Sequence, residues 1–365
     1  MKILFLTKYG QLGGSSRYMV HNYLEYFERA GLECTVSPLF DDRYFTLRTT
    51  DKPASIREIL RHGAYYFGRA SRRLQDLAKV THYDLVVFDK ELIPYLPYGL
   101  ELVLARRQPN CVALYDEATY LYYQRHPSPV VRVLARGKIE RILRTVKHVI
   151  VWNELLAQYV SQFNPRVSIV NPAIDLRRYR LAERRNSPLD GKPVVIGWIG
   201  TPNSFKYLQT LEPVFKMLKE RYPVELHVVS SIDYFSPYIR VVNKRWSLET
   251  EVDDLCQFDI GITPLRLDEW SRHKSGVKSV QYLGVGIPIV STPGGINSVI
   301  VRDGYNGFLA TTPDEWERAL AKLIENPSLR HRLGQAGRQM AEATYNQQKV
   351  AERLIAIFQQ VVEPE

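Results

Sequence analysis

The sequence predicts an α/β protein made of two doubly wound domains, each with a parallel sheet covered by helices on both faces. Short apolar runs and helical patterns follow one another along most of the 365 residues. Within the runs, apolar and polar residues scarcely alternate, as is typical of parallel strands buried on both faces. A charged segment divides this series into two, which is why we expect two domains.

The first series forms the predicted N-terminal domain, residues 1–176. Its strands are expected at 2–6, 34–37, 84–88, 111–115, 148–152 and 167–170, with helices at about 16–30 and 55–79. Residues 177–193 are charged, lack periodicity and end in Asp-Gly and Lys-Pro turn signals. We interpret this segment as a linker.

The second series forms the predicted C-terminal domain, residues 194–345. Its strands are expected at 194–200, 225–229, 259–265 and 288–292, with a helix at about 206–221 and helical patterns from Pro313 onward. The last segment, 346–365, is expected to be a helix and is a candidate to cross back to the N-terminal domain. In such Rossmann-like domains, ligands bind at the carboxyl ends of the strands, here across a cleft between the two domains.

Composition narrows the class of protein. The net charge of +10 suits nucleic acid, anionic lipid or phosphorylated ligands. No nucleic-acid recognition motif accompanies the charge, so we expect no nucleic-acid partner. The three cysteines are far apart and form no CxxC pair or Cys/His cluster, which argues against a zinc site or a disulfide framework and favours a cytoplasmic setting. No stretch approaches the roughly 18 to 20 apolar residues of a membrane span.

Two loops stand out as candidate binding sites. In GQLGGSSRY, residues 10–18, the pair Gly13 and Gly14 lies between the first strand and its helix, where backbone N–H groups can approach an anion or a sugar. A plain tight turn is the alternative. In KSGVKSVQYLGVGIPIV, residues 274–290, Lys274 and Lys278 lie four apart at the start of a helix. Like charges at this spacing repel, and cations are disfavoured at the positive end of the helix dipole.

A phosphate at this helix N-terminus would use the dipole, the free amides and both lysines together. A purely structural interpretation explains the glycines and Pro288 as turn and packing devices and Tyr282 as a core residue. It leaves both lysines without partners, unless they are a solvated surface pair. No Asp-x-Asp occurs in the chain, so amides and lysines are expected to replace a divalent metal.

The same stretch resembles the donor-site block of the retaining GT4-type glycosyltransferases, which have the GT-B fold, through its pattern K-x-x-x-K-x-x-Q-Y followed by a Gly-x-Pro turn. Residues 294–323, which include IVRDGYNGFL, and residues 148–179 resemble further segments of the family. Residues 40–110 resemble nothing that we can name. The resemblance implies transfer of a sugar from a UDP- or GDP-linked donor, without a further cofactor, to a glycan, lipid-linked or small-molecule acceptor.

The chain departs from the family pattern at several donor-site positions. The usual Glu-x7-Glu pair falls on His273, expected near the donor sugar, and Gln281, expected near the nucleotide ribose. The usual phosphate-clamping Arg and Lys fall on Thr201 and Lys206, so the arginine is missing and Lys278 is expected to supply the lost charge. Ser275 and Tyr282 complete the predicted donor site. These departures make a non-catalytic nucleotide-sugar binding protein an alternative, and a GT-B-fold nucleotide-sugar epimerase is another.

The strand 111–115 ends in Asp116 and Glu117, where the family carries a polar residue near the reacting carbon. A carboxylate there can stabilise the positive charge of an oxocarbenium-like transition state, so both residues are candidate catalytic groups. Capping of the next helix by Asp116 is the alternative.

Two basic amphipathic stretches, 55–79 and 131–147, lie in the N-terminal half. Such helices are candidates for contact with an anionic membrane surface, and a solvated charged face is the alternative. We therefore expect a cytoplasmic protein that is a candidate for peripheral attachment to the inner face of the membrane.

Overall fold

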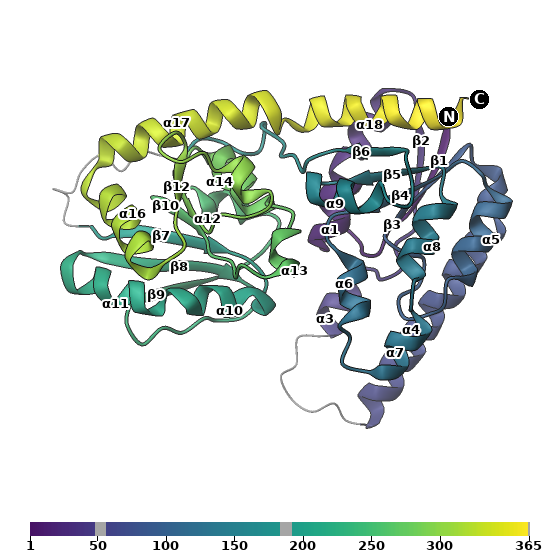
Figure 1. Ribbon diagram of the computed structural model, residues 1–365, viewed down its shortest axis with the longest axis horizontal. Coiled ribbons are helices and arrows are strands. Elements are labelled where there is room, and N and C mark those ends of the chain that lie inside the picture. Colours follow the sequence, from purple (N-terminus) through teal and green to yellow (C-terminus); the bar gives the residue numbers. More distant parts are fainter. Residues whose placement is uncertain (48–55, 183–191, 364–365) are drawn as a thin grey trace. The chain divides into compact units, whose positions relative to one another are not determined.

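The computed structural model describes residues 1–47, 56–182 and 192–363, and the chain divides into two compact units (Figure 1). Unit 1 comprises Met1–Asn171 together with Gln348–Glu365, and unit 2 comprises Pro172–Gln347. Of the segment 177–193 that we interpret as a linker, residues 183–191 lie outside the described residues.

Unit 1 is built on a six-stranded parallel sheet in the order β2-β1-β3-β4-β5-β6. Its helices and strands are β1 (Lys2–Leu6), α1 (Gly14–Met19), η1 (His21–Tyr23), α2 (Leu24–Arg29), β2 (Glu33–Val36), α3 (Arg43–Leu47), α4 (Ile56–Ala78), η2 (Val80–His82), β3 (Leu85–Asp89), α5 (Gly99–Arg107), β4 (Cys111–Tyr115), α6 (Thr119–Gln124), α7 (Pro129–Leu134), α8 (Lys138–Thr145), β5 (His148–Val151), α9 (Glu154–Val160), β6 (Val167–Ile169) and α18 (Gln347–Val362).

Unit 2 repeats the arrangement with a six-stranded parallel sheet in the order β12-β11-β10-β7-β8-β9. Its helices and strands are β7 (Val194–Ile199), η4 (Pro202–Ser204), α10 (Phe205–Leu208), η5 (Gln209–Leu211), α11 (Glu212–Arg221), β8 (Val224–Ser230), β9 (Val241–Arg245), α12 (Glu251–Leu255), β10 (Ile260–Thr263), α13 (Glu269–Arg272), α14 (Val277–Val285), β11 (Ile289–Ser291), α15 (Asn297–Ile300), β12 (Gly307–Leu309), α16 (Pro313–Glu325) and α17 (Pro327–Thr344).

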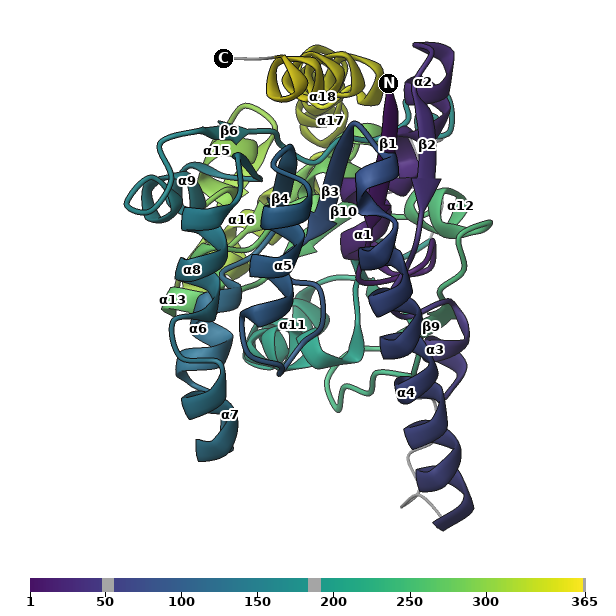
Figure 2. The same cartoon turned by 90° about the vertical axis from the view of Figure 1, so that its right-hand side faces the viewer.

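The central strands are buried on both faces, as their unbroken apolar runs predict. Every residue of β3 and of β4 is buried. Helices cover both faces of the unit 1 sheet in the second view, with α4 and α7 extending beyond it on the same side (Figure 2). The doubly wound α/β prediction is therefore confirmed for both units.

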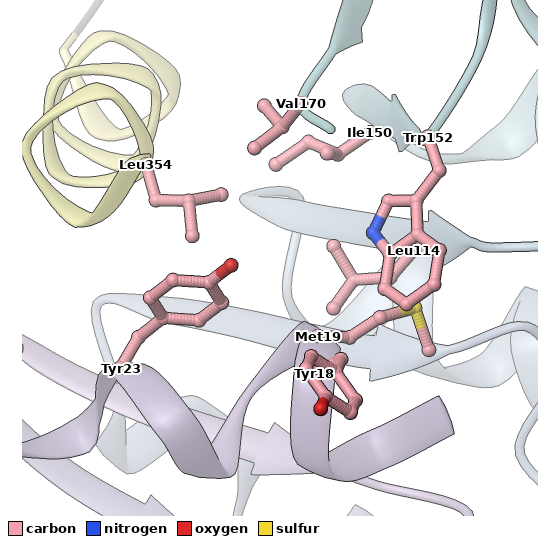
Figure 3. Close-up of a pocket in the computed structure, with 8 residues that line it drawn as sticks. All are labelled: Tyr18, Met19, Tyr23, Leu114, Ile150, Trp152, Val170 and Leu354. Carbon is pink, nitrogen blue, oxygen red and sulfur yellow. The ribbon is translucent and has the colours of Figure 1, made fainter. Parts of the chain in front are cut away.

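Helix α18 follows unit 2 in the chain but packs on unit 1. The ring of Phe358 lies 6.0 Å from that of Phe5 and 5.6 Å from that of Phe27. Leu354 of the same helix lines a small apolar cavity with Tyr23 and Val170 (Figure 3). The cavity has room for about one water molecule, so it is a packing gap rather than a ligand site.

Candidate functional site

In unit 2, Lys278 lies in the first turn of α14, close to the end of β7. Its Nζ is 4.2 Å from the ring centroid of Trp198, a β7 residue that is only 1% exposed. Gly200 follows β7, and a Cβ at this position would lie 2.6 Å from the same Nζ. A glycine is therefore needed here for the lysine to reach the strand end.

The charge of Lys278 is not compensated by a carboxylate in the described part of the chain, and the same holds for Lys274. Burial, followed by repulsion from Lys274, lowers the pKa of Lys278 to about 7. Desolvation of an ammonium and a nearby like charge both favour the neutral amine. An anion at this position would reverse both effects.

Lys274 and a further lysine, Lys206, both lie close to the ring of Tyr207. Lys274 Nζ lies 4.8 Å and Lys206 Nζ 5.2 Å from the ring centroid of Tyr207 in α10. The Tyr207 hydroxyl accepts a hydrogen bond of 3.3 Å from Ser271 Oγ. Tyr207 thus joins the segment after β7 to the segment after β10, and Thr201 lies at the start of the first of these, directly after Gly200.

Of the remaining predicted donor-site residues, His273 and Ser275 lie between β10 and α14, and Gln281 lies within α14. His273 closes the short helix α13 and its Nδ1 lies 2.8 Å from the carbonyl oxygen of Glu269, while Ser275 is half-buried in the turn before α14. Gln281 is buried and donates a hydrogen bond of 3.0 Å from Nε2 to the hydroxyl of Tyr179, which donates in turn to Glu251.

Tyr282 is a core residue, as the structural interpretation of this stretch expects. Its side chain is fully buried, and its hydroxyl accepts from the Ile199 amide at 3.1 Å and lies 3.4 Å from the Ile262 carbonyl oxygen. A Cβ on Gly261 would collide with the Tyr282 ring. Tyr282 therefore connects β7 and β10 beneath the lysines.

In unit 1, the glycine loop is tied to the ends of two neighbouring strands. A Cβ on Gly13 would lie 2.2 Å from Tyr9 Cβ, whereas a Cβ on Gly14 would meet nothing within 4 Å. Ser15 Oγ donates to Asp116 Oδ2 at 2.7 Å, and Ser16 Oγ donates to Asp89 Oδ2 at 2.7 Å. The loop is thus fixed against the carboxyl ends of β3 and β4, and close packing explains Gly13 but not Gly14.

Lys90 is the residue that sequence reasoning missed. Its Nζ lies 2.7 Å from Asp116 Oδ1 and 3.0 Å from Glu117 Oε1, and its side chain is only 3% exposed. Burial favours a lower pKa for Lys90, but Asp116, Glu117 and Asp89 raise it well above its usual value. The pKa of Asp116 is raised by burial despite the opposing effect of Lys90. The signal available in the sequence was only its position directly after a buried strand.

Asp116 is not a helix cap. Ala118 is the N-cap residue of α6, and no side chain caps this helix. The structural alternative for Asp116 is therefore wrong, and its carboxylate instead contacts Lys90 and Ser15.

Three charges of the two basic stretches point inward, whereas most of the described basic residues there, such as Arg72 and Arg141, are exposed. Arg73 is 2% exposed and donates to the Thr7 carbonyl oxygen at 2.7 Å. Arg69 donates to the Leu39 carbonyl oxygen at 2.8 Å and pairs with Asp41. Lys138 is 1% exposed and pairs with Glu91 at 2.7 Å. These three side chains support the fold of unit 1.

Two features of the described residues bear on the class of protein. None of the helices there is long and apolar enough to cross a membrane. Nor does that part of the chain contain a group of three or more His, Cys, Asp or Glu residues that could hold a metal ion.

Comparison with known proteins identifies the family of the unit 2 segment. Residues 269–340 match the family described as Glycosyl transferases group 1. Spore coat protein SA of Bacillus subtilis is 28% identical over 80 residues, and an uncharacterized glycosyltransferase of Methanocaldococcus jannaschii is 33% identical over 97 residues. These alignments span 21% and 25% of the respective relative, so they cover only a part of each.

Solved structures resemble the whole chain. Sucrose-phosphate synthase from Thermosynechococcus elongatus matches with a TM-score of 0.69 at 14% identity, covering 99% of both chains. Anabaena HepE in complex with UDP-glucose matches with a TM-score of 0.69 at 16% identity, covering 99% of this chain and 100% of that one. The predicted GT-B fold is confirmed, and the predicted resemblance to the group 1 glycosyltransferases is confirmed over residues 269–340.

Proposed function

On this fold and family match, we propose that the chain is a retaining glycosyltransferase that moves a hexose from a nucleoside-diphosphate sugar to a glycan, lipid-linked or small-molecule acceptor. The observation that carries the proposal is the pair Lys274 and Lys278, which lies at the carboxyl ends of the unit 2 strands with no carboxylate partner in the described residues. Retention of configuration is what the family resemblance implies.

The diphosphate of the donor is the anion that these lysines suit. It would restore the charged form of Lys278 and use the free amides of the first turn of α14, where the helix dipole favours negative charge. Lys206 and Lys274, which both lie close to the Tyr207 ring, would bind the outer oxygens. Three lysines and the free amides of a helix N-terminus can together hold a diphosphate without a divalent metal. We therefore propose metal-independent transfer.

A structural relative supports the proposed donor class. HepE has been solved with UDP and with UDP-glucose, and its fold is shared by this chain. We therefore propose a UDP- or GDP-linked hexose as donor, with His273 near the sugar and Gln281 near the ribose.

On the acceptor side, we propose that Asp116 and Glu117 act on the reacting carbon. With Lys90 charged between them, the three side chains carry a net charge of minus one. This residual negative charge would stabilise the oxocarbenium character of the transition state. The backbone of the Gly13–Gly14 loop would position the acceptor or the donor sugar.

The test is release of nucleotide from a panel of UDP- and GDP-linked hexoses, with and without a membrane-lipid extract or a mixture of free glycans. Nucleotide release that requires an acceptor and yields a glycosylated product supports the proposal. Conversion of the donor to its epimer without an acceptor would instead identify an epimerase. Binding of the nucleotide sugar with no turnover in any mixture would identify a non-catalytic binding protein.

We also propose that unit 1 attaches peripherally to anionic membrane through α7. Val130, Val133 and Leu134 of this helix are 62%, 73% and 50% exposed, and Arg132 lies among them. Apolar side chains with nearby arginines suit the headgroup region, although each basic residue contributes at most about 1 kcal/mol. Flotation with vesicles of anionic lipid should succeed for the intact chain and fail for Val130→Asp/Val133→Asp. Equal flotation of both proteins would contradict membrane contact at α7.

A further inference from the structure

Three ring side chains gather on the surface of unit 1 outside the residues considered so far. We call Tyr95, Tyr122 and His126 the aromatic platform. The Tyr95 ring lies 6.3 Å from that of Tyr122 and 5.8 Å from that of His126, and the Tyr122 and His126 rings are 5.3 Å apart. Tyr95 is 46% and Tyr122 41% exposed. Such large exposed rings in mutual contact are typical of binding surfaces.

The polar groups at the edges of the aromatic platform are held in place by hydrogen bonds. The hydroxyls of Tyr95 and Tyr122 share a hydrogen bond of 2.7 Å, so each fixes the orientation of the other. His126 Nδ1 accepts a hydrogen bond of 3.1 Å from the Ser128 amide, which leaves Nε2 as the donor of the neutral ring. The three rings are steeply inclined to one another, with interplanar angles of 55°, 68° and 74°. The platform therefore combines inclined apolar ring faces with hydroxyl and imidazole N–H groups at their rims.

The backbone of Tyr95 is held in a costly conformation. Its φ is +67°, in the left-handed region that a bulky residue rarely adopts. The Tyr95 amide donates at 3.1 Å to the hydroxyl of Tyr123, which donates at 2.7 Å to Glu91. Glu91 is fixed by its buried ion pair with Lys138. A buried ionic network thus holds an exposed ring in place, which is the arrangement expected where the ring position matters for function.

The aromatic platform is connected to the proposed acceptor residues by short stretches of chain. Tyr95 lies in the loop that begins at Lys90, and the Lys90 carbonyl oxygen accepts from the Tyr115 hydroxyl at 2.7 Å. Tyr122 lies in α6, which starts two residues after Glu117. Both rings therefore stand on the segments that leave the ends of β3 and β4.

From this geometry we propose that the aromatic platform is a saccharide-binding subsite. The Tyr122 ring stacks against the C–H face of a pyranose ring of the acceptor, the Tyr95 ring, inclined by 55° to it, contacts the edge of the same sugar, and their hydroxyls and His126 Nε2 contact its hydroxyl groups. The negative faces of aromatic rings attract polarised C–H groups. The inference rests on the proposed function in that it takes the acceptor to carry a sugar.

The experiment is saturation-transfer difference NMR on the full chain with a panel of methyl glycosides of glucose, galactose, mannose and N-acetylglucosamine. We expect transfer to the C–H protons of one ring face for at least one glycoside. Tyr122→Ala and Tyr95→Gly should weaken its binding about tenfold or more, since each removes a ring that contacts the sugar. Tyr122→Phe, which keeps the ring, should lose much less.

The variants are chosen so that folding does not obscure the result. Tyr122 is exposed, and glycine at position 95 relieves the left-handed strain rather than adding to it. Tyr238→Ala, which removes a tyrosine of unit 2 that is 43% exposed, is the matched control and should bind the glycosides as the native chain does.

Two outcomes overturn the proposal: no transfer to any glycoside in the panel, or binding that Tyr122→Ala and Tyr95→Gly leave unchanged. Titration with UDP keeps this test separate from the proposed function, because the predicted diphosphate site lies in unit 2. Glycoside binding without UDP binding would leave the platform in place and reject the donor. UDP binding without glycoside binding would leave the proposed donor in place and reject the platform.

Discussion

The two units place lysines at equivalent edges of their sheets but treat the charges in opposite ways. In unit 1, Lys90 is enclosed by the carboxylates of Asp116 and Glu117, which raise its pKa. In unit 2, Lys278 faces an indole ring and another lysine, and its pKa falls to about 7. One fold thus carries a compensated cation on one sheet and an uncompensated one on the other.

The difference shows that a lysine at a strand end has no fixed role. A buried cation with carboxylate partners contributes to folding and holds those carboxylates in position. A desolvated cation without them is a cost in the free protein that an anionic ligand can remove. Removing Lys90 should therefore lower the stability of the protein. Removing Lys278 should raise the stability of the free protein and weaken ligand binding.

The largest effect is expected for Lys90→Met. Removing one partner of a buried ion pair leaves Asp116 uncompensated, and such changes cost about 3–5 kcal/mol of the free energy of unfolding. Urea unfolding measures this loss. Adding Asp116→Asn should restore part of the stability, because it removes the stranded charge. Lys2→Met is the matched control, since Lys2 and Glu33 form an exposed pair and the loss should stay below about 1 kcal/mol.

A smaller effect with the opposite sign on stability is expected for Lys278→Met. UDP binding should weaken about tenfold to a hundredfold, because a charged hydrogen-bond partner is lost, while the free protein becomes more stable at pH 7. Calorimetric titration and thermal unfolding separate the two effects. Lys322→Met, which removes a lysine 5.0 Å from the Phe308 ring, is the control and should leave UDP affinity unchanged. Equal UDP affinity of the Lys278 variant and the native chain would reject the diphosphate site.

The pH dependence of binding sharpens the comparison further. With a pKa of about 7 in the free protein and a higher one beside a diphosphate, Lys278 takes up a proton on binding above pH 7. UDP affinity should therefore fall as pH rises from 7 to 9, by up to about tenfold per pH unit. Titrations in two buffers of different ionisation enthalpy at pH 8 measure the proton uptake. Its persistence in Lys278→Met would assign the proton to another group.

The smallest effect is expected on removal of metal. The phosphate groups are proposed to bind to lysines and amides, so turnover of the nucleotide sugar should be the same with and without EDTA. Activity that EDTA abolishes and Mn²⁺ or Mg²⁺ restores would mean that the uncompensated lysines do not replace a metal.

Most of the fold could be predicted because most of its strands are unbroken apolar runs in the sequence. Two strands were missed. β9 (Val241–Arg245) is an edge strand with only partly buried residues, and its Asn, Lys and Arg hide the pattern. β12 is three residues long, too short for periodicity to register. The two strands form the two edges of the unit 2 sheet. Burial is least complete at the edges of a sheet, so the apolar pattern there is weakest.

The candidate site was predictable only where charge lacked an evident partner. The spacing of Lys274 and Lys278 on one helix face was visible in the sequence, because local geometry decides it. Lys90 was not, because its partners Asp116 and Glu117 are distant in the chain and meet it only when β3 and β4 pair. The aromatic platform was missed for the same reason, since contact between Tyr95 and Tyr122 depends on how the loop after β3 and helix α6 come together.

The packing of α18 on unit 1 has a consequence for synthesis of the chain. Phe358 and Leu354 complete a core whose first strand, β1, is made before unit 2. All of unit 2 must emerge from the ribosome before they do. Unit 2 can therefore fold as its residues appear, whereas unit 1 keeps Phe5 and Phe27 incompletely covered until α18 has been made.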